Sequence, residues 1–187
     1  MKINSKIHFI GISGIGMSGI AELMLDKGYS IQGSDISVND NTKRLKKKGI
    51  KFFLGHNKKN IKYAHAVVYS SAIKKNNPEI REAYIKKIPV LSRADMLSEL
   101  MKNKKSIAIA GSHGKTTTTS LVGNIFNEAG LDPTIVNGGI INSFSNNNRY
   151  GKGEWMIVEA DESDGTFLKL PHQISIITNL DIEHMDF

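Results

Sequence analysis

The sequence of 187 residues contains no cysteine, which excludes a disulfide framework and a thiolate metal site. It also contains no run of about 18 apolar residues, the length that a membrane-spanning helix needs. The first residues, MKINSKIHFIGIS, lead directly into a strand pattern and contain no signal-peptide core. We therefore expect a cytoplasmic protein that is not inserted in a membrane.

The charge is unbalanced but lacks a nucleic-acid signature. There are 25 Lys and Arg residues against 18 Asp and Glu, a net charge of +7. The basic residues occur in short runs such as KRLKKK at 43–48, with no aromatic residues interleaved. We interpret these runs as solvated faces that also attract an anionic substrate, and we expect no nucleic-acid partner. A nucleic-acid-binding ATPase is the alternative that the charge alone suggests.

The stretch SIAIAGSHGKTTTTS, from Ser106 to Ser120, predicts a strand, a tight loop and a helix. Such a loop directs backbone N–H groups and the positive end of a helix dipole toward a phosphate. In this pattern Lys115 binds the outer phosphates, and the hydroxyl of Thr116 binds the accompanying magnesium. The first glycine of the full G-x-x-x-x-G-K-[ST] pattern is replaced by Ile109, so the loop is a shorter form, AGSHGKTT.

A second glycine-rich loop, GISGIGMSG at 11–19, follows a strand pattern at 6–10 and precedes a helix pattern. Its glycines satisfy G-x-G-x-x-G, and Asp35 lies where a dinucleotide-binding fold places the acid that binds ribose hydroxyls. The pattern requires only a pyrophosphate-sized anion on a helix N-terminus and a sugar near Asp35. NAD and a UDP-sugar both meet that description, so the ligand stays open at this point.

Polar residues also follow other predicted strands. Ser70 and Ser71 come directly after the strand pattern at 66–69, and Glu159 and His184 follow two strands of the second half. In open parallel sheets ligands lie beyond the C-terminal strand ends, so both serines are candidates for the first loop's pocket, although they also suit a plain turn. The Glu159 carboxylate suits magnesium, and His184 suits a second metal ion.

These patterns predict an α/β protein of two domains. A capping box at 92–95 opens a helix that ends in a basic segment, and we place the boundary there, with domains at 1–102 and 103–187. The first is expected to be Rossmann-like with a parallel sheet, and the second to be a P-loop-type α/β domain. Asn137 to Gly139 is expected to be a turn or an approach to a ligand, and the polar segment 143–153 a surface loop.

The motifs, taken in order, resemble those of the cytoplasmic Mur ligases along the whole chain. They are GISGIGMSG, GSD at 33–35, SSAI at 70–73, NPEI at 77–80, RADMLSELM at 93–101, AGSHGKTTTT at 110–119, GLDPT at 130–134, VNGG at 136–139, EADESD at 159–164, and TN with EHMD at 178–186. Together they are far more specific than any one of them. The short phosphate loop is the form found in that family, and the resemblance implies that the Rossmann-like domain holds a UDP-sugar rather than NAD.

The resemblance also implies roles for individual residues. ATP would be bound by Gly111, Ser112, His113, Gly114, Lys115, Thr116 and Thr117. UDP-N-acetylmuramate would be bound by Ser13, Gly14, Ile15, Gly16, Met17, Ser18, Asp35, Ser70 and Ser71. Magnesium would be bound by Thr116 and Glu159 and a second metal by His184, so that Lys115, Glu159 and His184 carry the catalysis. The family usually has Thr at the position of Ser112, a change that keeps the hydroxyl.

The reaction that the resemblance implies is an ATP-dependent amide formation in peptidoglycan synthesis. The carboxylate of UDP-N-acetylmuramate becomes an acyl phosphate, which the amine of L-alanine attacks. One alternative amine is the cell-wall tripeptide that a paralogous recycling ligase attaches. Another alternative, an NAD-dependent oxidoreductase, would leave the second phosphate loop without a purpose. Since family members continue into a further C-terminal domain, we expect an incomplete central ATPase domain here and no ligase activity from these residues alone.

Overall fold

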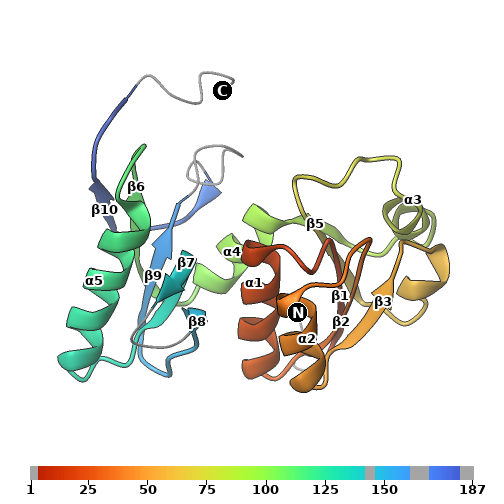
Figure 1. Cartoon of the computed structure of the whole chain (residues 1–187), viewed down its shortest axis with the longest axis horizontal. Coiled ribbons are helices and arrows are strands. Elements are labelled where there is room, and N and C mark those ends of the chain that lie inside the picture. The colour runs from red at the N-terminus through yellow and green to blue at the C-terminus, as the bar shows by residue number, and fades with distance from the viewer. Residues whose placement is uncertain (1–3, 142–145, 161–168, 182–187) are drawn as a thin grey trace. The chain divides into compact units, whose positions relative to one another are not determined.

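The computed structural model describes residues 4–141, 146–160 and 169–181, and the chain forms two compact units, Met1–Met96 and Leu97–Phe187 (Figure 1). Each unit contains one five-stranded sheet. Among the described residues no helix is long and apolar enough to cross a membrane.

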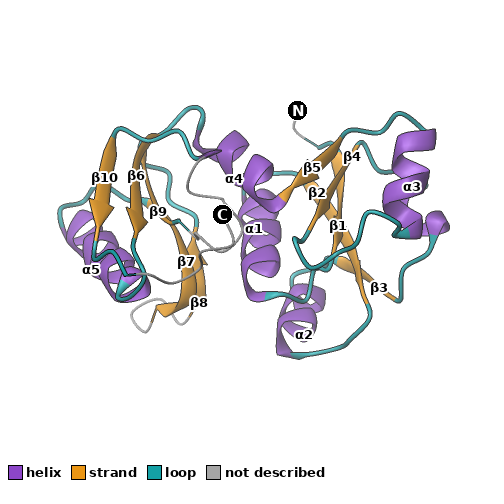
Figure 2. Ribbon diagram, turned by 90° about the horizontal axis from the view of Figure 1, so that it is seen from above, coloured by secondary structure: helices purple, strands orange, loops and turns teal. Residues whose placement is uncertain are grey.

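The first unit is a parallel sheet covered by helices on both faces, as a Rossmann-like fold requires. Its strands are β1 (Lys6–Ile10), β2 (Ser30–Asp35), β3 (Lys51–Leu54), β4 (Ala66–Tyr69) and β5 (Val90–Ser92), in the order β3-β2-β1-β4-β5. Its helices are α1 (Ile15–Asp26), α2 (Asp40–Lys47), the 3-10 helix η1 (Lys58–Ile61) and α3 (Pro78–Ile85), while α4 (Arg93–Met101) begins in this unit and ends in the second. Figure 2 shows α1 and α2 on one face of the sheet and α3 on the other. The strand order reverses beside β1, which marks the C-terminal end of β1 as the ligand-binding edge.

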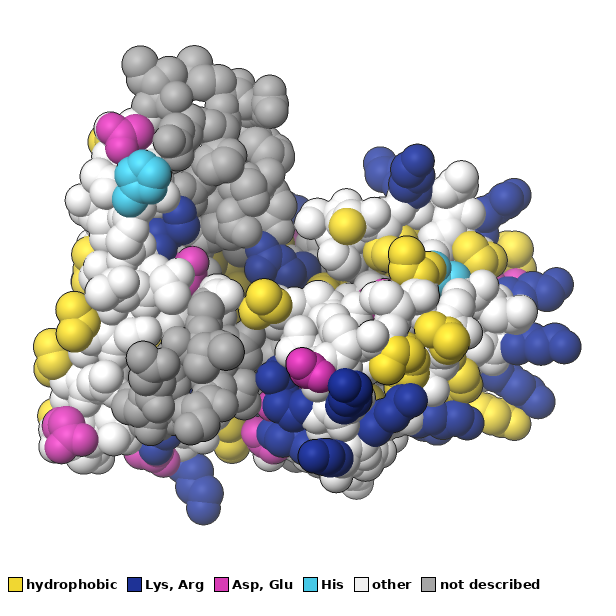
Figure 3. All heavy atoms as spheres, viewed as in Figure 1, with side chains coloured by type: hydrophobic (Ala, Val, Ile, Leu, Met, Phe, Trp, Pro, Cys, Tyr) yellow, Lys and Arg dark blue, Asp and Glu magenta, His cyan; other side chains and the backbone are white. Residues whose placement is uncertain are grey.

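Local sequence explains these elements. Asn77 caps α3 by accepting from the backbone N–H of Glu79 at 2.8 Å, and the predicted capping box of α4 is confirmed by the Asp95 carboxylate, which accepts from the N–H of Ser92 at 3.0 Å. Gly33 lies in the middle of β2 because a Cβ there would lie 2.7 Å from the carbonyl oxygen of Phe9. Figure 3 shows Lys and Arg side chains on the surface. In the basic run at 43–48, the Lys43 side chain is 66% exposed, as predicted for a solvated face, whereas Arg44 and Lys48 pair with the buried carboxylate of Glu22 at 2.6 Å and 3.0 Å.

The second unit is built around β6, the strand before the phosphate loop. Its elements are β6 (Lys105–Ala110), α5 (Lys115–Glu128), β7 (Thr134–Ile141), β8 (Asn146–Arg149), β9 (Trp155–Glu159) and β10 (Ile174–Ile177), with the sheet order β10-β6-β9-β7-β8. The strands expected before Glu159 and before His184 are confirmed as β9 and β10, and both pair in parallel with β6. Val122 and Phe126 of α5 pack against a core of Ile107, Ile109 and Ile157.

The structure differs from two expectations for the second unit. Of the two alternatives for Asn137 to Gly139, the turn is wrong because these residues are part of β7, and residues 146–149 of the expected surface loop form β8, which pairs antiparallel with β7 through Val136 and Asn148. Asparagine has a low strand propensity. An edge strand nevertheless forms here because its backbone pairs with β7 and because the buried side-chain oxygen of Asn148 accepts from the N–H of Asn137 at 3.2 Å.

Candidate functional site

The glycine-rich loop of the first unit joins β1 to α1 at the C-terminal edge of the sheet. Gly11 has a φ of +80°, and its N–H donates to the carbonyl of Ser34 at 2.9 Å, which ties the loop to β2. Helix α1 begins after Gly14, and no side chain caps it. The first turn of an uncapped helix presents backbone N–H groups and a positive dipole end, which suits a pyrophosphate.

Asp35 holds this loop in shape. Its carboxylate is buried and accepts from the backbone N–H of Ser13 at 2.9 Å and from that of Ser37 at 3.2 Å. The carbonyl of Ser13 accepts in turn from the side-chain amides of Asn39 at 3.1 Å and Asn41 at 2.8 Å. The acid at the end of β2 therefore holds the loop, and the expected contact of Asp35 with the sugar of a ligand stays a prediction.

The other sequence-predicted residues of this unit separate into two groups. Ser70 lies against the loop, because its Cβ is 3.1 Å from the position that a Cβ on Gly11 would occupy. Ser71 is exposed next to it. Met17 and Ser18 are buried, and the hydroxyl of Ser18 donates to the carbonyl of Ile15 at 3.0 Å. The structure thus brings Ser70 to the loop and places Met17 and Ser18 on the inner side of α1.

Arg93, the first residue of α4, is a basic residue beside this loop to which the sequence analysis gave no role. Its Nη1 lies 2.8 Å from the position that a Cβ on Gly16 would occupy, so only glycine allows the guanidinium to lie there. A guanidinium beside a helix N-terminus suits a pyrophosphate. The motif RADMLSELM contained the residue, but its proximity to Gly16 depends on the pairing of β4 with β5.

The phosphate loop of the second unit has the predicted conformation. Gly111 and Gly114 have φ angles of +128° and +80°, which other residues rarely adopt, and α5 begins at Lys115. The Lys115 ammonium donates to the carbonyls of Gly111 and Ser112, so the side chain is folded across its own loop. His113, Gly114 and Thr117 are exposed around it.

Thr116 and Glu159 meet beside the phosphate loop, as the sequence predicted. The hydroxyl of Thr116 donates to the carboxylate of Glu159 at 3.1 Å, and the backbone N–H of Gly138 donates to the same carboxylate at 2.7 Å. A Cβ on Gly138 would lie 2.7 Å from Glu159 Oε1, which explains the glycine. Hydroxyl and carboxylate oxygens are the ligands that magnesium prefers, so this pair fits the ion. His184, the predicted second-metal residue, lies outside the described residues.

Asn137 is a polar residue of this site, in the segment that the sequence analysis expected to be a turn or an approach to a ligand. Its amide nitrogen donates to the carbonyl of Thr116 at 3.2 Å and to the hydroxyl of Ser120 at 2.8 Å. Its Oδ1 is buried and has no hydrogen-bond partner in the described part of the chain. A buried acceptor without a partner costs free energy, so its place beside Thr116 marks it as a polar group of the site.

The tip that follows β10 holds the phosphate loop from the other side. The side chain of Asn179 accepts from the N–H of His113 at 2.9 Å and donates to its carbonyl at 3.1 Å, and Thr178 donates to the same carbonyl at 2.6 Å. A side chain on Gly111 would clash with Thr178. The pair TN was part of the family resemblance, but its contact with the loop follows from the parallel pairing of β10 with β6, which the sequence did not specify.

Comparison with known proteins identifies the class to which this arrangement belongs. Residues 6–105 match the Mur ligase family, catalytic domain, and residues 109–187 match the Mur ligase middle domain. The chain therefore belongs to the Mur ligase family, and the α/β fold expected from the sequence is confirmed.

Individual relatives narrow the resemblance. The chain is 58% identical over 189 aligned residues to the UDP-N-acetylmuramate--L-alanine ligase of Methylobacterium sp. (strain 4-46), an alignment that covers 100% of this chain and 40% of the relative. UDP-N-acetylmuramate-alanine ligase MurC from Thermotoga maritima has a TM-score of 0.89 at 34% identity, covering 97% of this chain and 43% of that one. The UDP-N-acetylmuramate:L-alanyl-gamma-D-glutamyl-meso-diaminopimelate ligase from Neisseria meningitides also has a TM-score of 0.89, at 25% identity, covering 96% and 62%. The chain thus spans 40% of the length of the first of these relatives.

Proposed function

We propose that this chain forms the UDP-sugar-binding and ATP-phosphate-binding portions of a cytoplasmic ligase that joins L-alanine to UDP-N-acetylmuramate in peptidoglycan synthesis. One observation carries the proposal. A phosphate loop with Lys115, and a Thr116–Glu159 pair with side-chain oxygens 3.1 Å apart, occur in a chain that also has a separate Rossmann-like unit. This whole chain is 58% identical to such a ligase.

The reaction has two steps. An oxygen of the lactyl carboxylate of UDP-N-acetylmuramate attacks the γ-phosphorus of ATP, the bond from that phosphorus to the β–γ bridging oxygen breaks, and ADP leaves. The amine of L-alanine then attacks the acyl carbon, phosphate departs and the amine loses a proton. Phosphoryl transfer requires little covalent chemistry from a protein, so positioning and electrostatic stabilisation account for catalysis.

In this proposal the phosphate loop supplies that positioning. Lys115 exchanges its contacts with the Gly111 and Ser112 carbonyls for the terminal phosphates of ATP, where its charge offsets the charge of the transferring group. Thr116 and Glu159 would hold magnesium, which polarises the phosphoryl oxygens when bound. His184 would hold a second metal ion.

The first unit would bind UDP-N-acetylmuramate through the glycine-rich loop. The pyrophosphate would lie on the N-terminal turn of α1, with Gly14 and Gly16 allowing close approach and Arg93 beside it. Ser70 and Ser71 border the same loop. Asp35 contributes by holding Ser13, since its carboxylate already accepts from that N–H.

A tripeptide-attaching ligase is the second candidate, because the Neisseria meningitides ligase matches the fold as closely as the Thermotoga maritima enzyme does. The sequence identity favours alanine as the amine, because the chain is 34% identical to the Thermotoga maritima enzyme and 25% identical to the Neisseria meningitides ligase. The two candidates share the chemistry and the UDP-sugar and differ only in the amine.

A calorimetric titration of the chain with UDP-N-acetylmuramate, NADH and an oligonucleotide at moderate salt tests the proposal. We expect saturable binding of the UDP-sugar and no response to NADH. Any binding of the oligonucleotide should be lost as the salt concentration is raised. Tight NADH binding without a response to the UDP-sugar would overturn the proposal.

A further inference from the structure

The two residues that follow β10, Thr178 and Asn179, hold the phosphate loop through the backbone of one loop residue, His113. The N–H of His113 donates to Oδ1 of Asn179 at 2.9 Å. The His113 carbonyl accepts from Nδ2 of Asn179 at 3.1 Å and from the Thr178 hydroxyl at 2.6 Å. The amide of Asn179 thus pairs with both hydrogen-bonding groups of His113, as a neighbouring strand would. We call Thr178 and Asn179 the β10 tip.

The loop and the β10 tip are also in direct contact at Gly111. A Cβ on Gly111 would lie 2.9 Å from the carbonyl oxygen of Asn179 and 3.0 Å from its backbone nitrogen, so a larger residue would displace the tip. The Ser112 hydroxyl accepts from the N–H of Asp181 at 3.2 Å. Three consecutive residues of the loop therefore contact the segment 178–181.

The contact with His113 determines the direction of the next N–H group in the loop. A trans peptide is planar, and its C=O and N–H point in opposite directions. The His113 carbonyl and the Gly114 N–H belong to the same peptide, so a carbonyl held by the β10 tip directs that N–H away from the tip. Gly114 is the residue before α5, and no side chain caps this helix. N–H groups at such a helix start are the donors that a phosphate needs.

β10 is itself weakly held in the described part of the chain. It is the edge strand of the sheet and pairs only with β6 there (Figure 2). Ile174 and Ile177 of β10 are 43% and 60% exposed, so the strand buries little apolar surface. Such a strand separates from its sheet at a lower free-energy cost than a central strand does. Separation of β10 would release His113.

We infer that Thr178 and Asn179 are positioning residues for ATP, and that the phosphate loop binds ATP only while β10 is paired with β6. The inference rests on the proposed function. It has a reciprocal consequence, because a ligand that binds only the paired form must hold β10 on the sheet.

Asn179→Ala tests the positioning role. The substitution removes both bonds of the side chain to His113 and leaves the backbone pairing of β10 with β6 in place. We expect ATP with magnesium to bind the 187-residue variant about threefold to tenfold more weakly, the effect of about one neutral hydrogen bond. Calorimetry measures the affinity, and UDP-N-acetylmuramate should bind the variant as it binds the unaltered chain.

Gln173→Ala is the matched control, because Gln173 holds Ser106 in the same way at the other end of β10. The Ser106 N–H donates to Oε1 of Gln173 at 2.6 Å, and the Ser106 carbonyl accepts from the Gln173 N–H at 3.0 Å. Both substitutions should lower the midpoint of urea unfolding. Only Asn179→Ala should weaken ATP, since β10 stays paired in nearly all molecules of either variant.

The reciprocal consequence is tested on the unaltered chain by hydrogen exchange. The Thr178 N–H donates to the carbonyl of Ala110 at 3.0 Å, so its exchange reports the separation of β10. At about one hundred times its dissociation constant, ATP should slow this exchange by up to about one hundredfold. The Gly153 N–H, which donates to the Asp132 carbonyl at 2.9 Å before β9, is the control and should exchange at an unchanged rate.

The outcomes separate the inference from the function beneath it. Equal ATP affinity of Asn179→Ala and the unaltered chain, or an equal loss in Gln173→Ala, would overturn the inference alone. Slowing of the Thr178 and Gly153 amides by the same factor, or of neither, would also overturn it, and this measurement stands even if Asn179→Ala does not fold. No binding of ATP to the unaltered chain would overturn the proposed function and the inference with it.

Discussion

At the scale of single residues, magnesium binding in the proposed function depends on the Glu159 carboxylate. This carboxylate accepts from the Thr116 hydroxyl and from the Gly138 N–H. We expect Glu159→Gln to remove most of the dependence of ATP binding on magnesium, because an amide oxygen is a weaker ligand than a carboxylate while its shape keeps the fold. Calorimetry with ATP in magnesium or in chelator measures the effect. Glu154→Gln, an exposed residue just before β9, should behave like the unaltered chain.

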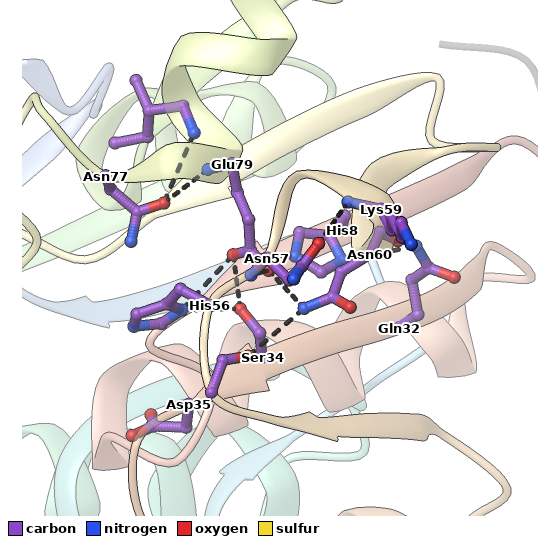
Figure 4. Close-up of polar contacts among 12 residues, drawn as sticks. His8, Gln32, Ser34, Asp35, His56, Asn57, Lys59, Asn60, Asn77 and Glu79 are labelled. Atoms are coloured by element: carbon purple, nitrogen blue, oxygen red, sulfur yellow. Dashed lines mark hydrogen bonds and ion pairs between the residues drawn. The ribbon is translucent and has the colours of Figure 1, made fainter.

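The carboxylate of Glu79, drawn with its polar neighbours in Figure 4, makes the stability of the protein depend on pH. Burial alone would raise the pKa of Glu79, but His8, Ser34 and Asn60 lower it in the folded state. Its stabilising contribution is therefore fully present above the ordinary glutamate value of about 4.3 and is lost as the pH falls through the lower folded value. We expect Glu79→Gln to lower the free energy of unfolding by about 1–3 kcal/mol at pH 7, and the difference to shrink below about pH 4.

Urea unfolding between pH 3 and pH 7 measures this difference. The control is Glu82→Gln, one turn further along α3, whose carboxylate pairs with Lys86 at the surface and should contribute about 0–1 kcal/mol. A difference between Glu79→Gln and the unaltered chain that stayed constant down to pH 3 would contradict the assignment of a lowered pKa.

Sequence patterns pointed to those residues of the candidate site that a local motif specifies. Lys115 and Thr116 are given by the phosphate-loop pattern, and Glu159 by its place after a strand. The inward orientation of Asp35 and the contact of Asn179 with His113 could not be predicted, because each depends on how segments far apart in sequence meet. The spacing of Asp35 matched a ribose-binding acid, but spacing does not determine the direction of a side chain.

At the scale of elements, apolar periodicity predicted most strands and helices and failed at a polar edge. β8 was missed because its residues, NNNR, carry no apolar alternation, and its pairing with β7 depends on the backbone. α5 was predicted, but Leu121 and Ile125 of its apolar positions are 58% and 65% exposed in the described structure. Periodicity therefore identified the helix without identifying its buried face.

Gly123 allows α5 to approach β7 closely. A Cβ at this position would lie 2.6 Å from Cδ1 of the buried Ile135, with every other atom at 3.3 Å or more. Gly123→Ala gains about 1 kcal/mol of helix propensity but overpacks the contact at about 1–3 kcal/mol, so we expect a net loss of up to about 2 kcal/mol. Ile135→Val removes Cδ1 and alone costs about 0.5–1.5 kcal/mol.

A double-mutant cycle tests this packing. Valine removes the one atom that the new methyl group would meet. The loss of stability in the double variant should therefore be smaller than the sum of the two single losses by about 1 kcal/mol or more. The free energy of unfolding of the four proteins is measured in urea. Additive losses would show that the proximity of Gly123 to Ile135 does not limit the packing of α5.

At the scale of the whole molecule, the chain divides into two compact units with separate sheets, and the sole tryptophan, Trp155, lies in the second. Its fluorescence therefore reports the unfolding of that unit. A ligand that binds only the folded first unit stabilises it by about 2.7 kcal/mol at one hundred times its dissociation constant. We expect UDP-N-acetylmuramate to move a urea transition followed by far-UV circular dichroism and to leave the Trp155 transition in place, while magnesium and ATP have the opposite effect. Equal movement of both transitions with either ligand would show that the two sheets unfold as one cooperative structure, and a ligand assignment made unit by unit would then have no thermodynamic basis.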